Sequence, residues 1–194
     1  MAVHATHDEA VGIARRLTED QSRRLAEYVD GLKEVLACGV QFRDYLRWHP
    51  QRVGHCPFLS EASTCGIYAQ RPLSCRALLS TRPAAWCATD LAALDDWDRE
   101  LYRQSLDPEF VAWPSHFIAA TQTYARDLEA HLLARQKSRY GWSLSGNFPL
   151  LVWLEREHQV SHRPLDVCFR RLTGLNAESL FVLDLDPSKT STTN

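Results

Sequence analysis

Residues 54–76 read GHCPFLSEASTCGIYAQRPLSCR and carry three of the chain's six cysteines, Cys56, Cys65 and Cys75. Cys87 follows, with eleven residues between it and Cys75. Thiols gathered in this way bind a metal or an iron–sulfur cluster, form disulfides or perform redox chemistry. The choice among these decides how the middle of the chain folds, because this segment shows no sustained hydrophobic period of its own.

The wider segment, residues 51–88, contains three prolines and two glycines and predicts irregular structure. A loop-rich stretch of this length within a domain needs something that orders it. Four cysteines bound to one centre would supply that order. We therefore expect an irregular cysteine-rich metal-binding region inserted between helices.

The residues before this segment predict helix. Apolar residues recur at helical spacing along residues 25–46; they are Leu25, Tyr28, Leu32, Val35, Gly39, Phe42 and Leu46. Thr18 and Gln21 have the spacing of a capping box at the start of this helix. Residues 8–17 predict a separate short helix.

The residues after the cysteines also predict helices, at 89–103, at 115–136 with Ser115 as N-cap, and from Pro149 onward. Residues 139–149, RYGWSLSGNFP, predict a turn-rich linker. The fold class expected is mainly α, a single bundle-like helical domain over residues 1–185 with the cysteine segment 51–88 inserted. Residues 186–194 predict a disordered tail.

The net charge and the distribution of apolar residues limit the partners and the compartment to be expected. The chain has 194 residues and a net charge of −2, so no nucleic-acid partner is expected. The N-terminal residues lack the basic and apolar parts of a signal peptide, and no apolar run is long enough for a membrane span. We therefore expect a cytoplasmic protein, whose thiols stay reduced. That compartment favours a metal or catalytic role over disulfides.

The cysteine spacing favours one kind of centre. Zinc fingers and ribbons place pairs of ligands two to four residues apart, and the four cysteines here have eight, nine and eleven residues between them. A [4Fe–4S] cluster has corners that point in four directions, which suits single cysteines on long loops. A Zn²⁺ ion held by four thiolates stays the alternative.

The segment resembles the YkgJ-type cysteine-cluster family, described as zinc- or iron-chelating proteins, and its pattern G-x-C-x-FL, C-x-IY-x-x-RP-x-x-CR. The matching residues are Gly54, Cys56, Phe58, Leu59, Cys65, Ile67, Tyr68, Arg71, Pro72, Cys75 and Arg76. It is also distantly similar to the cluster segment of flagellin lysine methylases, for which a [4Fe–4S] centre is favoured. The resemblance covers about an eighth of the chain, and it implies that Cys56, Cys65 and Cys75 are ligands.

The chain departs from that family upstream, where the additional group of cysteines is reduced to Cys38. We take Cys87 as the fourth ligand, with Cys38, His49 and His55 as the alternatives. As the alternative to a ligand role, we expect Cys38 and Cys168 to be small buried residues.

The neighbours of the cysteines have expected roles of their own. Phe58 and Tyr68 should pack around the centre and shield it from solvent. Arg71 and Arg76 are either donors that offset thiolate charge or ordinary surface arginines.

Two functions follow. The first is a [4Fe–4S] protein with a redox or a protein- or peptide-modifying role. The second is a structural zinc site in a helical protein-interaction domain without catalysis. A protein or peptide is the expected partner in either case. The sequence leaves open whether the protein is an enzyme, because no P-loop, dinucleotide fingerprint or nucleophile elbow is present.

Overall fold

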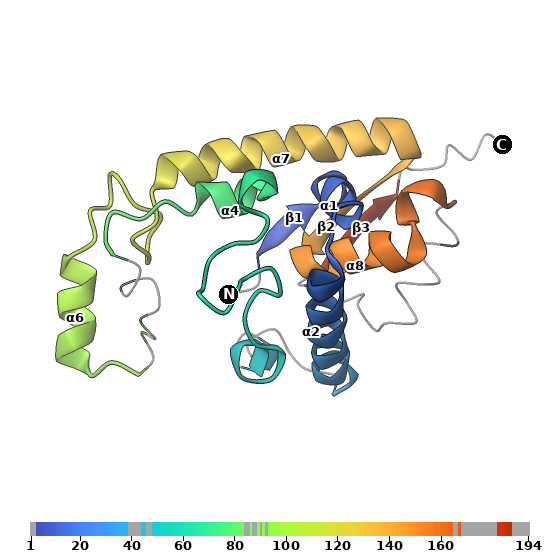
Figure 1. Cartoon of the computed structure of the whole chain (residues 1–194). Helices are drawn as coiled ribbons and strands as arrows, with labels where there is room; N and C mark the ends of the chain where they lie inside the picture. The colour runs from blue at the N-terminus through green and yellow to red at the C-terminus, as the bar shows by residue number, and fades with distance from the viewer. Residues whose placement is uncertain are drawn as a thin grey trace. The chain divides into compact units, whose positions relative to one another are not determined.

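Helices make up most of the computed structural model, which describes residues 3–38, 44–45, 48–83, 86, 89, 91, 93–164, 167 and 182–187. The mainly α class is therefore confirmed, and one small sheet accompanies the helices (Figure 1). The chain divides into two compact units, Met1–Pro72 with Ala130–Asn194, and Leu73–Glu129. No helix in the described ranges combines the length and the apolar character that a membrane crossing needs.

The first unit contains a three-stranded antiparallel sheet in the order β1 (His4–Thr6), β2 (Trp142–Asn147) and β3 (Leu183–Pro187). The central strand lies in the stretch that the sequence predicted to be a turn-rich linker, so that prediction is wrong. Serine, glycine and asparagine are typical of turns. Here they form a strand because β2 has a hydrogen-bonded partner on each side, which a reading of local residues does not reveal.

Gly146 shows why a glycine stands inside this strand. Its φ angle is +147°, in the region that favours glycine. A Cβ at this position would lie 2.2 Å from the main-chain oxygen of Val182. The close approach of the two backbones therefore requires the residue without a side chain.

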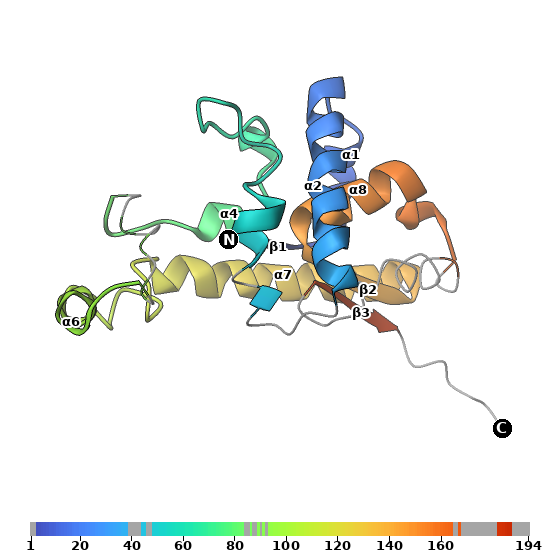
Figure 2. The same ribbon diagram turned by 90° about the horizontal axis from the view of Figure 1, so that it is seen from below.

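Helix α8 (Phe148–His158) is the central helix of the first unit and contacts α1 (His7–Ala14), α2 (Glu19–Ala37) and the strands β1 and β2. Figure 2 shows α2 and α8 from below, beside the sheet. The first seven residues of α8, FPLLVWL, are all apolar, which is typical of a buried helical segment. Its side chains join those of α2 in the core; among them are Leu150, Leu151, Leu154, Leu25, Val29 and Leu32.

Helix α2 begins as the sequence predicted. Thr18 is the N-cap, and its capping box with Gln21 is complete. The predicted stripe is buried from Leu25 to Val35, whereas its later members Gly39, Phe42 and Leu46 lie outside the described residues. The short helix expected at residues 8–17 is α1.

The second unit contains α4 (Leu73–Ala77), α6 (Asp96–Gln104) and the part of α7 (Ala119–Tyr140) up to Glu129. Helix α6 begins later than predicted, with Asp95 as its N-cap. Helix α7 also begins later than the predicted Ser115, because the residues before it pair in short bridges, Ser80 with Phe117 and Val111 with Ile118. The small core of this unit is formed by Tyr102, Leu106 and Val111, with Leu91 and Leu94 packed against it.

The expected tail at residues 186–194 overlaps a strand. Strand β3 extends to Pro187, and residues 188–194 lie outside the described residues.

Candidate metal centre

The loop that carries Cys56 and Cys65 is a small hydrogen-bonded hairpin. Leu59 and Cys65 form an antiparallel bridge. The amide of Gly66 donates to the oxygen of Phe58 at 2.8 Å, and the amide of Leu59 donates to the oxygen of Cys56 at 3.1 Å. The hairpin therefore holds two of the expected ligands at its base.

Ser60 and Thr64 close the hairpin at its tip. The amide of Ser60 donates to the oxygen of Thr64 at 2.8 Å. The two hydroxyls lie 2.7 Å apart, and the Ser60 Oγ atom also accepts from the amide of Thr64 at 3.2 Å. Serine and threonine favour such local bonds in turns.

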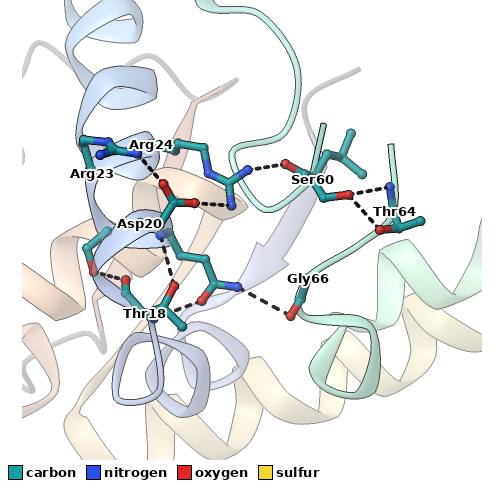
Figure 3. A network of polar contacts seen from close by, with 10 residues as sticks. Thr18, Asp20, Arg23, Arg24, Ser60, Thr64 and Gly66 are labelled. Atoms are coloured by element: carbon teal, nitrogen blue, oxygen red, sulfur yellow. Dashed lines mark hydrogen bonds and ion pairs between the residues drawn. The ribbon is translucent and has the colours of Figure 1, made fainter. Parts of the chain in front are cut away.

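The hairpin is fastened to the first turns of α2 (Figure 3). The Nη1 atom of Arg24 donates to the oxygen of Leu59 at 2.6 Å, and its Nη2 atom pairs with Asp20 at 3.2 Å. The side-chain amide of Gln21 lies 3.5 Å from the oxygen of Gly66, at the limit of a hydrogen bond. Hydrogen bonds within the protein thus order this part of the segment, which the sequence predicted to be irregular.

Gly54 leads the chain into this loop. Its φ of +86° and ψ of −156° belong to a region that is essentially restricted to glycine. The glycine that the family pattern carries at this position therefore has a backbone reason in this chain. It ends the π-helix η1 (His49–Val53) and turns the backbone toward Cys56.

Hydrophobic packing against the core of the first unit holds the loop of Cys56 and Cys65 in place. Phe58 is fully buried, and its ring centroid lies 5.4 Å from that of Phe148. Cys56 and Cys65 are half-buried and pack against the same core. The prediction that Phe58 is a packing residue is confirmed. Tyr68 is 65% exposed, so the prediction that it packs around the cysteines is wrong.

Arg71 explains where Tyr68 points. The guanidinium carbon of Arg71 lies 3.9 Å from the centroid of the Tyr68 ring, a cation–π contact at the surface. Tyr68 is the first residue of η2 (Tyr68–Gln70), and Arg71 follows this helix near the end of the first segment of the first unit. Arg71 therefore serves at least to cover an exposed aromatic ring.

The environment of the hairpin changes the acidity of the Cys56 thiol. Burial raises the pKa of the Cys56 thiol, a hydrogen bond from the Phe58 amide lowers it, and the nearby Cys65 raises it further. Cys56 and Cys65 are both free thiols. Cys56 is therefore protonated at neutral pH, and a metal ion that binds it must displace that proton.

A buried polar cluster lies behind Cys56 and was missed by sequence reasoning. It consists of Tyr28, Tyr45, His49 and Asn147, which are all at most 5% exposed. The side-chain amide of Asn147 donates to the Tyr28 phenol at 3.0 Å and lies 3.4 Å from that of Tyr45. Cys56 is near enough to contribute to the raised pKa of Tyr28, which burial dominates.

The hydrogen bonds in this cluster define the protonation state of His49 and the role of its Nε2 atom as an acceptor. Because Asn147 donates to the Tyr28 oxygen, the phenol proton is directed to the Nε2 atom of His49, 2.8 Å away. Burial lowers the pKa of His49 to about 4. His49 is thus neutral and accepts through Nε2, so it would have to give up the Tyr28 bond to bind a metal through that atom.

Asn147 has a second role that the sequence could have indicated. Its Oδ1 atom accepts from the amide of Leu150 at 3.0 Å, which makes it the N-cap of α8. An asparagine two residues before Pro149 is a recognisable helix start. That its amide group also joins Tyr28 and Tyr45 follows only from the tertiary contacts.

The remaining candidate ligands are distributed as follows. Cys75 is half-buried on α4, in the second unit. His55 is exposed beside Cys56. Cys87 and Cys168 lie outside the described residues.

Cys38 is exposed at the C-cap of α2, and its thiol lies 3.4 Å from the oxygen of Glu34. The prediction that Cys38 is buried is wrong, because α2 ends there and leaves the side chain in solvent.

The structure therefore brings together Cys56 and Cys65 among the predicted ligands. Among the residues it describes, no group of three or more His, Cys, Asp or Glu side chains is close enough to hold a metal ion. No protein-family model matches the sequence, and the searches of curated proteins and of solved structures gave no match either.

Proposed function

We propose that this protein holds a [4Fe–4S] cluster through Cys56, Cys65, Cys75 and Cys87, and that the cluster has a redox or a protein- or peptide-modifying role. The observation that carries the proposal is the hairpin, which holds Cys56 and Cys65 half-buried against one core. Thiolates are the protein ligands of such clusters. The donor set is soft and carries no carboxylate, which fits iron–sulfur or zinc rather than a hard cation.

The surroundings of the hairpin support a centre at this position. A cluster needs a shell that limits solvent access and supplies hydrogen bonds to the sulfur ligands. Phe58 provides buried apolar surface, and its amide already forms a hydrogen bond with Cys56. Arg24 provides a positive charge at the neighbouring Leu59 oxygen. Such a centre requires reduced thiols, and we propose a cytoplasmic location for that reason.

A structural zinc site without catalysis is the second candidate. It is favoured by the second unit, whose exposed large apolar side chains are typical of a protein-interaction domain; they are Leu79, Trp86, Trp97, Leu101, Phe110, Trp113 and Tyr124. A zinc ion bound by four thiolates contributes folding free energy, on the order of 10 kcal/mol in zinc-finger peptides. Under this candidate, chelation by EDTA lowers the melting temperature of the protein.

Anaerobic purification tests both candidates in one experiment. An iron–sulfur protein is brown, absorbs broadly in the visible range and contains iron and acid-labile sulfide in equal amounts. A zinc protein is colourless and contains one zinc ion per chain. Protein that is free of both metals and binds neither on reconstitution contradicts the proposal of a metal centre.

The modifying role has a separate test, because it rests on the resemblance to flagellin lysine methylases. Isothermal calorimetry with S-adenosylmethionine measures whether the protein binds the methyl donor. Binding supports methyl transfer to a protein or peptide. Absence of heat at millimolar ligand argues against that role and leaves the redox role in place.

A further inference from the structure

The second unit contains a pocket that the metal centre does not use. Its volume is about 360 Å³, and its lining residues are Trp86, Thr89, Leu94, Asp98, Leu101 and Tyr102. All six belong to the second unit. The pocket is therefore a feature of this unit alone.

One face of α6 forms a wall of the pocket. Asp98 and Leu101 lie three residues apart on α6 and therefore on the same side of the helix, and Leu94 lines the pocket from the residues just before the N-cap Asp95. Tyr102 is 7% exposed, and its ring centroid lies 6.0 Å from that of Trp86. The pocket is thus apolar and aromatic with one carboxylate in it.

The Asp98 carboxylate has no hydrogen-bond or ion-pair partner among the described residues. Its main-chain amide donates to the N-cap Asp95 at 2.8 Å, but that bond does not involve the carboxylate. By contrast, the carboxylate of Asp96 in the same turn pairs with Arg99 at 2.7 Å. Asp98 therefore presents an unused negative charge to a largely apolar pocket.

The nearby arginines do not supply the missing positive charge. Arg99 donates to the oxygens of Leu91 and Leu94 in addition to its pair with Asp96. Arg82 lies 5.5 Å from the centroid of the Trp86 ring and is not among the lining residues.

The surface next to the pocket is suited to a partner. Leu101 is 48% exposed, and Trp97, which precedes Asp98 on the same helix, is 72% exposed. Exposed apolar patches of this kind mark interaction sites.

We propose that this pocket binds a lysine or arginine side chain of a partner polypeptide. The aliphatic stem of the side chain lies on Leu101 and Leu94, and its cationic head reaches the Asp98 carboxylate beside the Trp86 ring. Long basic side chains combine an apolar stem with a charged end, and aromatic rings attract cations. The charge complementarity of Asp98 selects this occupant over a purely apolar segment. The proposal goes beyond the metal centre and does not depend on it.

Nuclear magnetic resonance on the full-length protein tests the proposal. The probe is N-acetyl-lysine N′-methylamide, followed through the indole N–H signal of Trp86, which Trp86→Phe identifies. The matched probe is N-acetyl-norleucine N′-methylamide, which has a similar stem and lacks the ammonium group. We expect saturable shifts of the Trp86 signal at millimolar lysine probe, and an affinity for the norleucine probe that is weaker by about fivefold, the factor that a partly exposed ion pair supplies.

Two variants separate the charge of the pocket from the stability of α6. Asp98→Asn should weaken the lysine probe by about fivefold and leave the norleucine probe unchanged. Asp96→Asn removes a carboxylate from the same helical turn and should leave both probes unchanged. Equal affinity for the two probes, an unchanged affinity in Asp98→Asn, or no shift of the Trp86 signal with either probe would overturn the proposal. A shift that depends on protein concentration instead of probe would show that a second copy of the chain occupies the pocket.

Discussion

The Nη1 atom of Arg24 donates a 2.6 Å hydrogen bond to the main-chain oxygen of Leu59 and thereby fastens the cysteine hairpin to α2. Leu59 lies between Cys56 and Cys65, and its bridge with Cys65 forms the first pair of the hairpin. A charged donor bound to a main-chain oxygen is stronger than a neutral one. This bond is therefore a point at which the hairpin can be loosened without touching a thiol.

Arg24→Met should lower the free energy of unfolding by about 1–2 kcal/mol, because it leaves the Leu59 oxygen without its donor. Hydrogen exchange of the Gly66 amide should become faster in this variant. Urea denaturation and exchange measured by nuclear magnetic resonance check the two effects. The control is Arg23→Met, which removes an exposed pair with Asp20 and should cost less than about 0.5 kcal/mol. Equal effects of the two variants would contradict the role given to Arg24.

Serine substitutions of the cysteines should separate ligands from bystanders. Cys87→Ser should lose the metal centre, as should the corresponding changes at Cys56, Cys65 and Cys75, because a serine hydroxyl is a poor substitute for a thiolate. Metal content per chain after anaerobic purification is the measurement. Cys168→Ser should retain the centre. Retention in Cys87→Ser together with loss in Cys38→Ser would exchange the roles of these two residues.

The neutral His49 makes stability depend on pH. Its pKa is about 4 in the folded protein and 6.5 as the ordinary value, so the unfolded chain binds the proton more readily between these values. The contribution of the neutral His49 to the free energy of unfolding is fully present above pH 6.5 and is lost as the pH falls toward 4. We expect the free energy of unfolding of metal-free protein to fall by about 2 kcal/mol from pH 7 to pH 5 through this residue.

His49→Gln is the variant that isolates this effect. Its side-chain oxygen can accept the hydrogen bond from Tyr28 but does not bind a proton in this range. Urea denaturation at the two pH values should show a smaller pH dependence than in the unaltered protein. An unchanged dependence would assign the effect to another group, such as His116, whose pKa burial also lowers.

Replacement of glycine by alanine should change the free energy of unfolding in opposite directions at Gly146 and Gly12. Gly146→Ala should lower the free energy of unfolding by about 3 kcal/mol or more, because its Cβ would overlap the Val182 oxygen at a positive φ. Gly12→Ala, exposed in α1 with no atom near the new Cβ, should raise it by about 0.5–1 kcal/mol. Thermal unfolding of the two variants gives both signs. A tolerated Gly146→Ala would contradict the close pairing of β2 with β3.

The helices were predictable where a local signal and a hydrophobic period coincide. The capping box of Thr18 and the apolar stripe from Leu25 fix the start and the buried face of α2 from neighbouring residues alone. Helix α6 was placed too early because its apolar spacing continues through Leu91 and Leu94, which pack on the core outside the helix.

The sequence by itself determined the mainly helical class and the position of the cysteine segment in the chain, because helical periods, caps and motif spacing are local properties. Only the tertiary structure decided that residues 142–147 form a central strand, since a strand depends on partners that are distant along the chain. The same holds for the site. The thiols of Cys56 and Cys65 are visible in the sequence. The bond of Arg24 to the hairpin and the buried cluster of Tyr28, His49 and Asn147 form only when the core closes around them, since Tyr28 and Asn147 alone are 119 residues apart.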